Sequence, residues 1–279
     1  MTMQSSEHSE LKDLEIELLL EAIFRQFGYD FRQYAPASLR RRILHCMRQE
    51  ELKTVSLLQD RVLHDPGCMQ RFLSRVTVNS TDMFRDPLFF KSFHHQVTPL
   101  LRQFPLARIW HAGCSTGEEV YSVAILLSEE GIYDQCRIYA TDLSEAALAQ
   151  AKEGVYPLSA MRGYSENYLR AGGKKSLAEY YTAAYGKAIF HAPLRRNVVF
   201  AQHNLATDGS FNEFHAIMCR NVMIYFNQPL GARVLRLLFD SLGPSGVLAL
   251  GLKEVLHAST EGASFEPFDG TAGIYRKVC

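Results

Sequence analysis

The 279-residue sequence lacks several features that would assign it to a class at once. Its 30 Lys and Arg residues balance its 30 Asp and Glu residues, so no net charge favours nucleic acid, and any charged docking site must be local. No apolar run reaches bilayer-spanning length, and residues 1–13 contain no apolar signal region. The sequence therefore predicts a cytoplasmic protein that is not inserted in a membrane. Nothing in it requires more than a monomer.

The patterns of metal sites are also missing. The six cysteines are scattered, without a Cys-x-x-Cys pair, and His94 and His95 are adjacent rather than at helical spacing. In a chain of this length the cysteines are expected to be reduced thiols that serve as small apolar residues. No metal site is expected.

Residues 108–128, RIWHAGCSTGEEVYSVAILLS, organise the chain. A short apolar strand at 109–112 leads through the turn Gly113–Gly117 into an apolar helix. Such a turn lets a ligand approach the backbone at a helix start. The third glycine of G-x-G-x-x-G and the Gly-Lys-Ser/Thr ending are both absent, which disfavours a nicotinamide dehydrogenase or a triphosphate site.

Two glutamates, Glu118 and Glu119, stand where a phosphate would otherwise lie. Carboxylates repel phosphate but suit a cation or hydroxyl groups. S-adenosylmethionine carries a sulfonium, an ammonium and a ribose, and has no phosphate. The alternative is that both glutamates only stabilise the helix dipole.

The N-terminal part reads as a small all-α domain, with helical segments between residues 11 and 75. Residues 31–49 contain five arginines and no acid, and a helix there would place its apolar and basic residues on opposite faces. This basic stripe is either a solvated face or a docking surface for an acidic helix or nucleic acid. The arginines of the stripe considered for docking are Arg40, Arg41, Arg42 and Arg48.

The C-terminal part alternates strands and helices, which predicts a doubly wound, Rossmann-like α/β fold. Strands are expected at 136–142, 197–205, 215–226, 246–254 and 273–279, with helices at 143–154 and 228–243. Asp142 ends the second strand, where such folds grip ribose hydroxyls, although it could instead be a helix cap. Residues 155–196 are too long for a loop, and Tyr185-Gly186-Lys187 predicts a hairpin within this insertion.

A polar segment at 76–91 separates the two parts. Asn79, Thr81 and Arg85 lie in it, and Asp86-Pro87 looks like a helix start. Taken alone, these residues could be turn, cap and surface ion-pair residues.

Taken together, the motifs resemble the CheR family, the chemoreceptor glutamate O-methyltransferases of bacterial chemotaxis. The resemblance runs from about residue 20 to the C-terminus. Its specific pieces are N-S-T leading to F-R-D-P at 79–87, W-H-A-G-C-S-T-G-E-E-V-Y-S at 110–122, A-T-D-L-S at 140–144 and C-R-N-V-M-I-Y-F at 219–226.

This resemblance implies a helical receptor-docking domain at 1–80 and a methyltransferase domain at 81–279, with a small inserted β-subdomain at roughly 160–196. It implies that S-adenosylmethionine is bound. Beside it stands the hypothesis that Arg85 orients or neutralises the acceptor carboxylate and that Tyr225 lines the catalytic site. The implied cofactor-binding residues are Asn79, Thr81, Arg85, Gly113, Glu119, Asp142, Asn204, Leu205, Arg220 and Asn221.

The implied reaction converts receptor glutamates to methyl esters, leaving S-adenosylhomocysteine. The implied partners are the cytoplasmic methylation helices of chemoreceptors, docked on the four arginines, and in some members a receptor's C-terminal tether peptide, gripped by the insertion. Two other classes stay open: a binding module that takes up S-adenosylmethionine without turnover, and a methyltransferase for another substrate.

Overall fold

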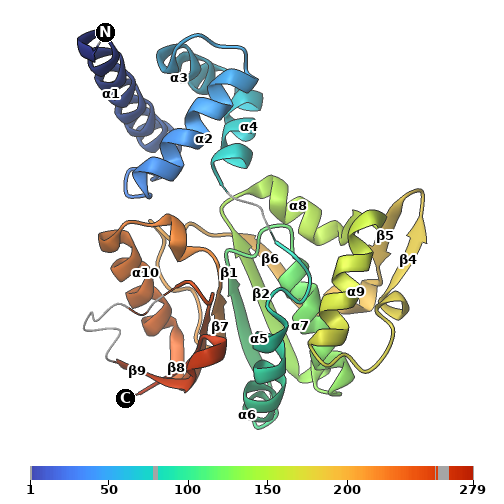
Figure 1. Ribbon diagram of the computed structural model, residues 1–279. Helices are drawn as coiled ribbons and strands as arrows, with labels where there is room; N and C mark the ends of the chain where they lie inside the picture. The colour runs from blue at the N-terminus through green and yellow to red at the C-terminus, as the bar shows by residue number, and fades with distance from the viewer. Residues whose placement is uncertain (1, 78–80, 255, 257–263, 279) are drawn as a thin grey trace. The chain divides into compact units, whose positions relative to one another are not determined.

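The computed structural model describes residues 2–77, 81–254, 256 and 264–278, and the side chains from Glu10 onward. The chain forms two units (Figure 1). One consists of Met1–Val78 with Tyr225–Gly231, and the other of Asn79–Ile224 with Ala232–Cys279.

The first unit is helical, as predicted. Its helices are α1 (Thr2–Phe27), α2 (Pro36–Gln49), α3 (Val55–His64) and α4 (Pro66–Val76). Thr54 caps α3 by accepting the Leu57 N–H, and Asp65 caps α4 ahead of Pro66, which suits a first helical position. The core consists of apolar side chains from all four helices and from the segment after α1, including Leu19, Ile23, Phe31, Ile43, Leu58 and Phe72.

A short segment from far along the chain completes this unit. The Ala35 N–H donates to the carbonyl of Tyr225 (2.8 Å), and the Asn227 N–H donates to that of Gln33 (2.9 Å). The rings of Tyr34 and Phe226 meet edge to face, with centroids 5.1 Å apart. The motif at 219–226 is therefore divided between the two units.

The second unit is built on a seven-stranded sheet of order β6-β2-β1-β7-β8-β10-β9. Strands β6, β2, β1, β7 and β8 are parallel, whereas β10 is antiparallel to both β8 and β9. This arrangement confirms the predicted Rossmann-like fold. The sheet strands are β1 (Ala107–Ala112), β2 (Cys136–Asp142), β6 (Val198–Gln202), β7 (Phe214–Cys219), β8 (Leu242–Leu250), β9 (Phe265–Asp269) and β10 (Ile274–Lys277).

Helices precede the first strand of this unit and connect the later ones. They are α5 (Pro87–Ser92), the π-helical η1 (Phe93–Val97), α6 (Thr98–Leu101), α7 (Glu118–Glu129), α8 (Glu145–Glu153), α9 (Met161–Arg170) and α10 (Gln228–Ser241), of which α10 begins in the segment Tyr225–Gly231 of the first unit. Short 3-10 turns are η2 (Tyr133–Gln135), η3 (Leu158–Ala160), η4 (Leu177–Tyr180), η5 (Ala192–Arg195), η6 (Met223–Tyr225) and η8 (Gly270–Ala272). As predicted, Ser144 caps α8 and Gly154 ends it with a positive φ of 65°.

The insertion forms its own three-stranded sheet of order β3-β5-β4, drawn in yellow-green to yellow at the right of this unit in Figure 1. Its strands are β3 (Val155–Pro157), β4 (Tyr181–Ala184) and β5 (Lys187–Phe190). The predicted hairpin is confirmed, because β4 and β5 pair across Tyr185 (φ 50°) and Gly186 (φ 72°). Positive φ at both positions is what a two-residue hairpin turn requires.

Several strand predictions extended too far, and two strands were missed. The strands expected at 197–205, 215–226 and 246–254 end at Gln202, Cys219 and Leu250. The apolar letters after Cys219 suggest a strand, but Asn221 has a φ of 60°, which breaks the extended backbone. Strand β9 contains Pro267, which argues against a strand from sequence but is tolerated at an edge, and β3 has only three residues.

No helix within the described ranges combines the length and apolar character needed to cross a membrane.

Candidate cofactor-binding site

The order of the strands places the topological switch point of the sheet between β1 and β7. The carboxyl ends of these two strands and the loops that follow them are called the crevice below. The chain continues from β1 to β2 and β6 on one side, and from β7 to β8 on the other. The loops after β1 and β7 therefore diverge, and ligands of open parallel sheets bind outside the carboxyl ends of the strands at such a point. Three of the ten predicted cofactor residues, Gly113, Arg220 and Asn221, lie on these two loops.

The loop after β1 approaches the loop after β7 closely. Gly113 has a φ of 80°, and its N–H donates to the carbonyl of Thr141 (2.8 Å). A Cβ atom at this position would lie 2.6 Å from Cγ2 of Val222, so no larger residue fits without displacing a turn. The glycine predicted from the motif is thus needed for both backbone conformation and space.

Asp142, at the end of β2, holds the glycine turn. Its carboxylate accepts the N–H of Ser115 (2.8 Å) and the N–H of Ser144 (2.9 Å). The N-cap of α8 is Ser144, whose hydroxyl accepts the Ala147 N–H, so Asp142 is not the cap itself. Burial raises the pKa of Asp142, and the donated N–H groups oppose that rise.

A buried ion-pair network joins the β7 loop to α7 and to the segment before α5. Arg220, with its side chain 1% exposed, donates to Glu119 (2.7 Å) and to Asp86 (2.8 Å). Its guanidinium also lies 3.9 Å from the ring centroid of Phe89. The His111 imidazole shares a 3.1 Å hydrogen bond with Glu119. Arg220 therefore links the β7 loop to α7 and to the segment before α5.

The electrostatics of this network favour the ionised form of Glu119. Burial alone would raise the pKa of Glu119, but Arg220 and His111 outweigh it and lower that pKa to about 2. The neighbouring Glu118 differs, because burial raises its pKa to about 7 and its main partner is the Thr116 hydroxyl (2.7 Å). Glu118 is only 5% exposed.

Four residues around the crevice have positive φ although none is glycine. They are Phe84 (51°), Asp86 (57°), Ser115 (51°) and Asn221 (60°). Such conformations are sparsely populated and persist where the surroundings over-determine them, which is common at functional sites. Phe84 is held by the Ser122 hydroxyl on α7, which accepts its N–H at 2.9 Å.

The other predicted cofactor residues are distributed as follows. Arg85 is half-buried between the two strained residues Phe84 and Asp86, and Thr81 is half-buried in the same irregular segment. Asn204 and the buried Leu205 follow β6, and the Asn204 side chain accepts the Ala206 N–H at 3.0 Å. Asn79 lies outside the described residues.

The predicted docking arginines lie on α2 in the helical unit. Arg41 and Arg48 are exposed, and Arg40 pairs with Asp13 (2.7 Å). Arg42 differs, because its guanidinium lies over the ring of Tyr225, 5.1 Å from the centroid. Nε and Nη2 of Arg42 are buried, and neither has a hydrogen-bond partner in the described part of the chain. Burial lowers the pKa of this guanidinium.

Sequence reasoning missed three members of the β1–β7 crevice. The sequence marks Asp86 only as part of a helix start, and it assigns no role to His111 or Glu254. No local sequence signal marked these roles, because Asp86 before Pro87 resembles a helix cap, although its side chain makes no cap hydrogen bond in the structure. Glu254 accepts backbone N–H groups of the β7 loop.

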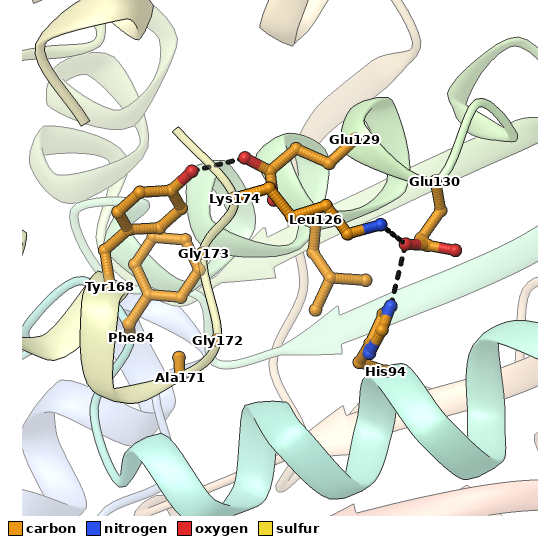
Figure 2. Close-up of a pocket in the computed structure, with 10 residues that line it drawn as sticks. All are labelled: Phe84, His94, Leu126, Glu129, Glu130, Tyr168, Ala171, Gly172, Gly173 and Lys174. Atoms are coloured by element: carbon orange, nitrogen blue, oxygen red, sulfur yellow. Dashed lines mark hydrogen bonds and ion pairs between the residues drawn. The ribbon is translucent and has the colours of Figure 1, made fainter. Parts of the chain in front are cut away.

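A separate pocket lies near the other end of α7 (Figure 2). Glu130 accepts from His94 (2.7 Å) and Lys174 (2.5 Å), and the Tyr168 hydroxyl donates to Glu129. A twelve-residue helix is about 18 Å long, so Glu129 and Glu130 lie far from the glycine turn at its start, although Phe84 borders both this pocket and the crevice. Its lining residues are Phe84, His94, Leu126, Glu129, Glu130, Tyr168, Ala171, Gly172, Gly173 and Lys174.

Comparison with known families gives two matches that together span most of the chain. The model described as CheR methyltransferase, SAM binding domain, matches residues 79–273. The model described as CheR methyltransferase, all-alpha domain, matches residues 14–77.

Curated relatives include three bacterial proteins. One named "Putative methyltransferase Cher3", of Pseudomonas putida, is 52% identical over 265 residues, covering 95% of this chain and 97% of the relative. "Chemotaxis protein methyltransferase 2" of Pseudomonas aeruginosa is 37% identical and covers 70% of each chain. "Chemotaxis protein methyltransferase" of Listeria monocytogenes is 30% identical, covering 88% of this chain and 92% of the relative.

Proposed function

Because the chain belongs to the CheR methyltransferase family, we propose that it transfers the methyl group of S-adenosylmethionine to glutamate side-chain carboxylates of chemoreceptors. Its cofactor is S-adenosylmethionine, and relatives that carry the family domains are named chemotaxis methyltransferases. The glutamate acceptor and the roles of individual residues are the proposal.

The crevice residues fit this cofactor. Gly113 leaves room for close approach to the backbone, and the side chains around it supply carboxylates and amides rather than lysines. Asp142 suits ribose hydroxyls, and Glu119 contributes negative charge that suits an ammonium or a sulfonium. We propose that Thr81, Arg85, Asn204, Leu205, Arg220 and Asn221 complete the site, together with Asn79.

The proposed reaction places few demands on the protein's acid–base chemistry. When bound, the cofactor supplies a methyl group on a positively charged sulfur. A glutamate acceptor has an ordinary pKa of about 4.3 and is already ionised at neutral pH, so it needs no general base. The protein must orient the carboxylate and remove its water. We propose that Arg85 and Tyr225 take part in this orientation.

The observation that carries the choice of acceptor is the state of Arg42. Two nitrogens of the half-buried Arg42 guanidinium, Nε and Nη2, are buried without a hydrogen-bond partner among the described residues, which is costly and favours an anion that supplies the missing acceptors. A receptor glutamate carboxylate could accept from both Nε and Nη2 at once, as guanidinium–carboxylate pairs commonly do. Arg41 and Arg48, exposed on the same helix, would attract an acidic receptor helix over longer range.

The inserted subdomain offers a second contact for a receptor. Strand β4 lies at the edge of its sheet, where an added peptide strand could pair with it. We propose this edge for the C-terminal tether of receptors that carry one.

The test is to incubate the protein with radiolabelled S-adenosylmethionine and chemoreceptor-containing membranes, and to ask whether mild base releases the label as methanol. Base-labile label on a receptor-sized band supports carboxyl methylation. Label that resists base contradicts the acceptor, and intact cofactor binding with no label favours a binding module.

The same assay tests Arg42. Arg42→Ala is expected to lower receptor methylation by about tenfold or more, the loss expected for a charge-assisted hydrogen bond, with cofactor affinity unchanged. Arg170→Ala, which removes an exposed arginine from α9, is the matched control. Equal methylation by both variants would contradict the role of Arg42.

A further inference from the structure

Glu254 accepts an unusual number of backbone hydrogen bonds. Its side chain is buried after β8, and its two oxygens collect N–H groups from two loops. The donors to Oε1 are Val222 (2.8 Å), Met223 (2.7 Å) and Ile224 (3.3 Å), and those to Oε2 are Asn221 (2.8 Å) and Gly251 (2.6 Å). Four of these five donors are consecutive residues of the β7 loop.

The carboxylate thereby ties together the ends of two neighbouring parallel strands. Cys219 of β7 is in register with Leu250 of β8, and the chain turns immediately after each. The space is fully used at Gly251, where a Cβ atom would lie 2.7 Å from Nδ2 of Asn221 and 2.8 Å from Oε2 of Glu254. The β7 loop thus has little freedom to move while Glu254 is in place.

A group of backbone N–H groups that converge on one point, here called an N–H fan, forms an anion-binding site when no side chain of the protein occupies it. This one lies at the carboxyl ends of β7 and β8, next to the switch point between β1 and β7 where such sheets bind their ligands. Here the fan is filled by the chain's own carboxylate. The same loop carries Arg220 and Asn221, and its Val222 side chain packs against Gly113 of the glycine turn. The position of this loop therefore affects both sides of the crevice.

We infer that Glu254 is a positioning residue for the cofactor: it fixes the β7 loop by occupying the loop's anion site, and so excludes phosphate-bearing ligands from it. The inference rests on the proposed function only through the shared cofactor site. It concerns cofactor binding and requires no methyl acceptor.

The first test compares Glu254→Gln with wild type by calorimetric titration of S-adenosylhomocysteine. The amide keeps the shape but replaces one acceptor oxygen by a donor, which opposes the N–H groups. Affinity should fall by about tenfold or more, as expected for losing several charge-assisted hydrogen bonds. Glu266→Gln, at an exposed position on β9, should bind like wild type. Affinity of Glu254→Gln within about twofold of wild type would overturn the inference.

The second test distinguishes positioning from general destabilisation. Glu254→Ala should empty the N–H fan, so added formate should restore affinity for S-adenosylhomocysteine, whereas chloride at equal ionic strength should not. The empty fan should also bind inorganic phosphate, which wild type should not. Folded Glu254→Ala that neither recovers with formate nor binds phosphate would overturn the inference.

If Glu254→Ala folds poorly, its thermal unfolding is compared in formate and in chloride. Selective stabilisation by formate supports the inference, and identical curves overturn it. Failure of the proposed function would look different: wild type would bind S-adenosylhomocysteine normally, and receptors would remain unmethylated.

Discussion

Replacing Glu119 by glutamine perturbs the buried network at the crevice with little change of shape. Among the residues that the structure describes, Arg220 would keep only Asp86 as an ionic partner, and the His111 hydrogen bond would lose its charged acceptor. The Arg220 side chain is 1% exposed, so water cannot replace the lost carboxylate. We therefore expect Glu119→Gln to destabilise the methyltransferase unit.

The magnitude follows from the pKa of Glu119, which is lowered from 4.5 to about 2 in the folded chain. That difference corresponds to about 3 kcal/mol of stability at pH 7. Since the folded pKa is depressed, this stability is fully present above pH 4.5 and is lost as the pH falls toward 2. At pH 3 less than half of it should remain.

The measurement is urea unfolding of wild type and Glu119→Gln at pH 7 and pH 3. The difference in unfolding free energy between the two should shrink by about 2 kcal/mol on acidification. Glu153→Gln, at an exposed position on α8, controls for the loss of a carboxylate. A difference that is the same at both pH values would refute the ionic coupling between Glu119 and Arg220.

Two further substitutions test the packing and charge of each unit. Gly113→Ala should lower the unfolding free energy by about 1–3 kcal/mol and weaken S-adenosylhomocysteine binding, because its Cβ would collide with Val222 and the residue would keep a positive φ. The control is Gly163→Ala, which has open space around its Cβ position and should show no loss of stability in urea unfolding. Glu50→Gln should lower the unfolding free energy of the helical unit by about 2 kcal/mol at pH 7, because Arg71 and two other arginines surround its carboxylate and hold its pKa at about 2. The control is Glu51→Gln at an exposed position, and equal stability of the two variants would contradict this role of Glu50.

The elements that the sequence predicted well are those specified by neighbouring residues. The helix after Ser144 has its cap and its stop within the same short segment, and the Tyr185-Gly186 hairpin has its turn residues between its strands. The glycine turn at Gly113 follows its strand directly. In each case the residues that cause the structure lie within a few positions of it, so the local sequence pattern is enough to predict it.

The features that the sequence did not predict depend on distant residues. Arg220 pairs with Asp86 and Glu119, which are 134 and 101 residues away along the chain. The residues after Cys219 are apolar enough to predict a strand. They form a turn instead because the carboxylate of Glu254, 33 residues beyond Asn221, binds their backbone N–H groups. Asp86 before Pro87 has the appearance of an ordinary helix cap, although its carboxylate is used elsewhere.

The carboxylates of Glu254, Asp142 and Glu119 differ in how many further hydrogen bonds they can accept from a ligand. Glu254 accepts three N–H groups on one oxygen and two on the other, which uses the capacity of a carboxylate. Asp142 accepts the Ser115 N–H on one oxygen and the Ser144 N–H on the other, with Leu143 as a further backbone donor, and Glu119 accepts from His111 on one oxygen and from Arg220 on the other. Each of these two can therefore accept further hydrogen bonds, which is the physical reason to propose Asp142 and Glu119 as ligands of the cofactor and Glu254 as the residue that positions their loop.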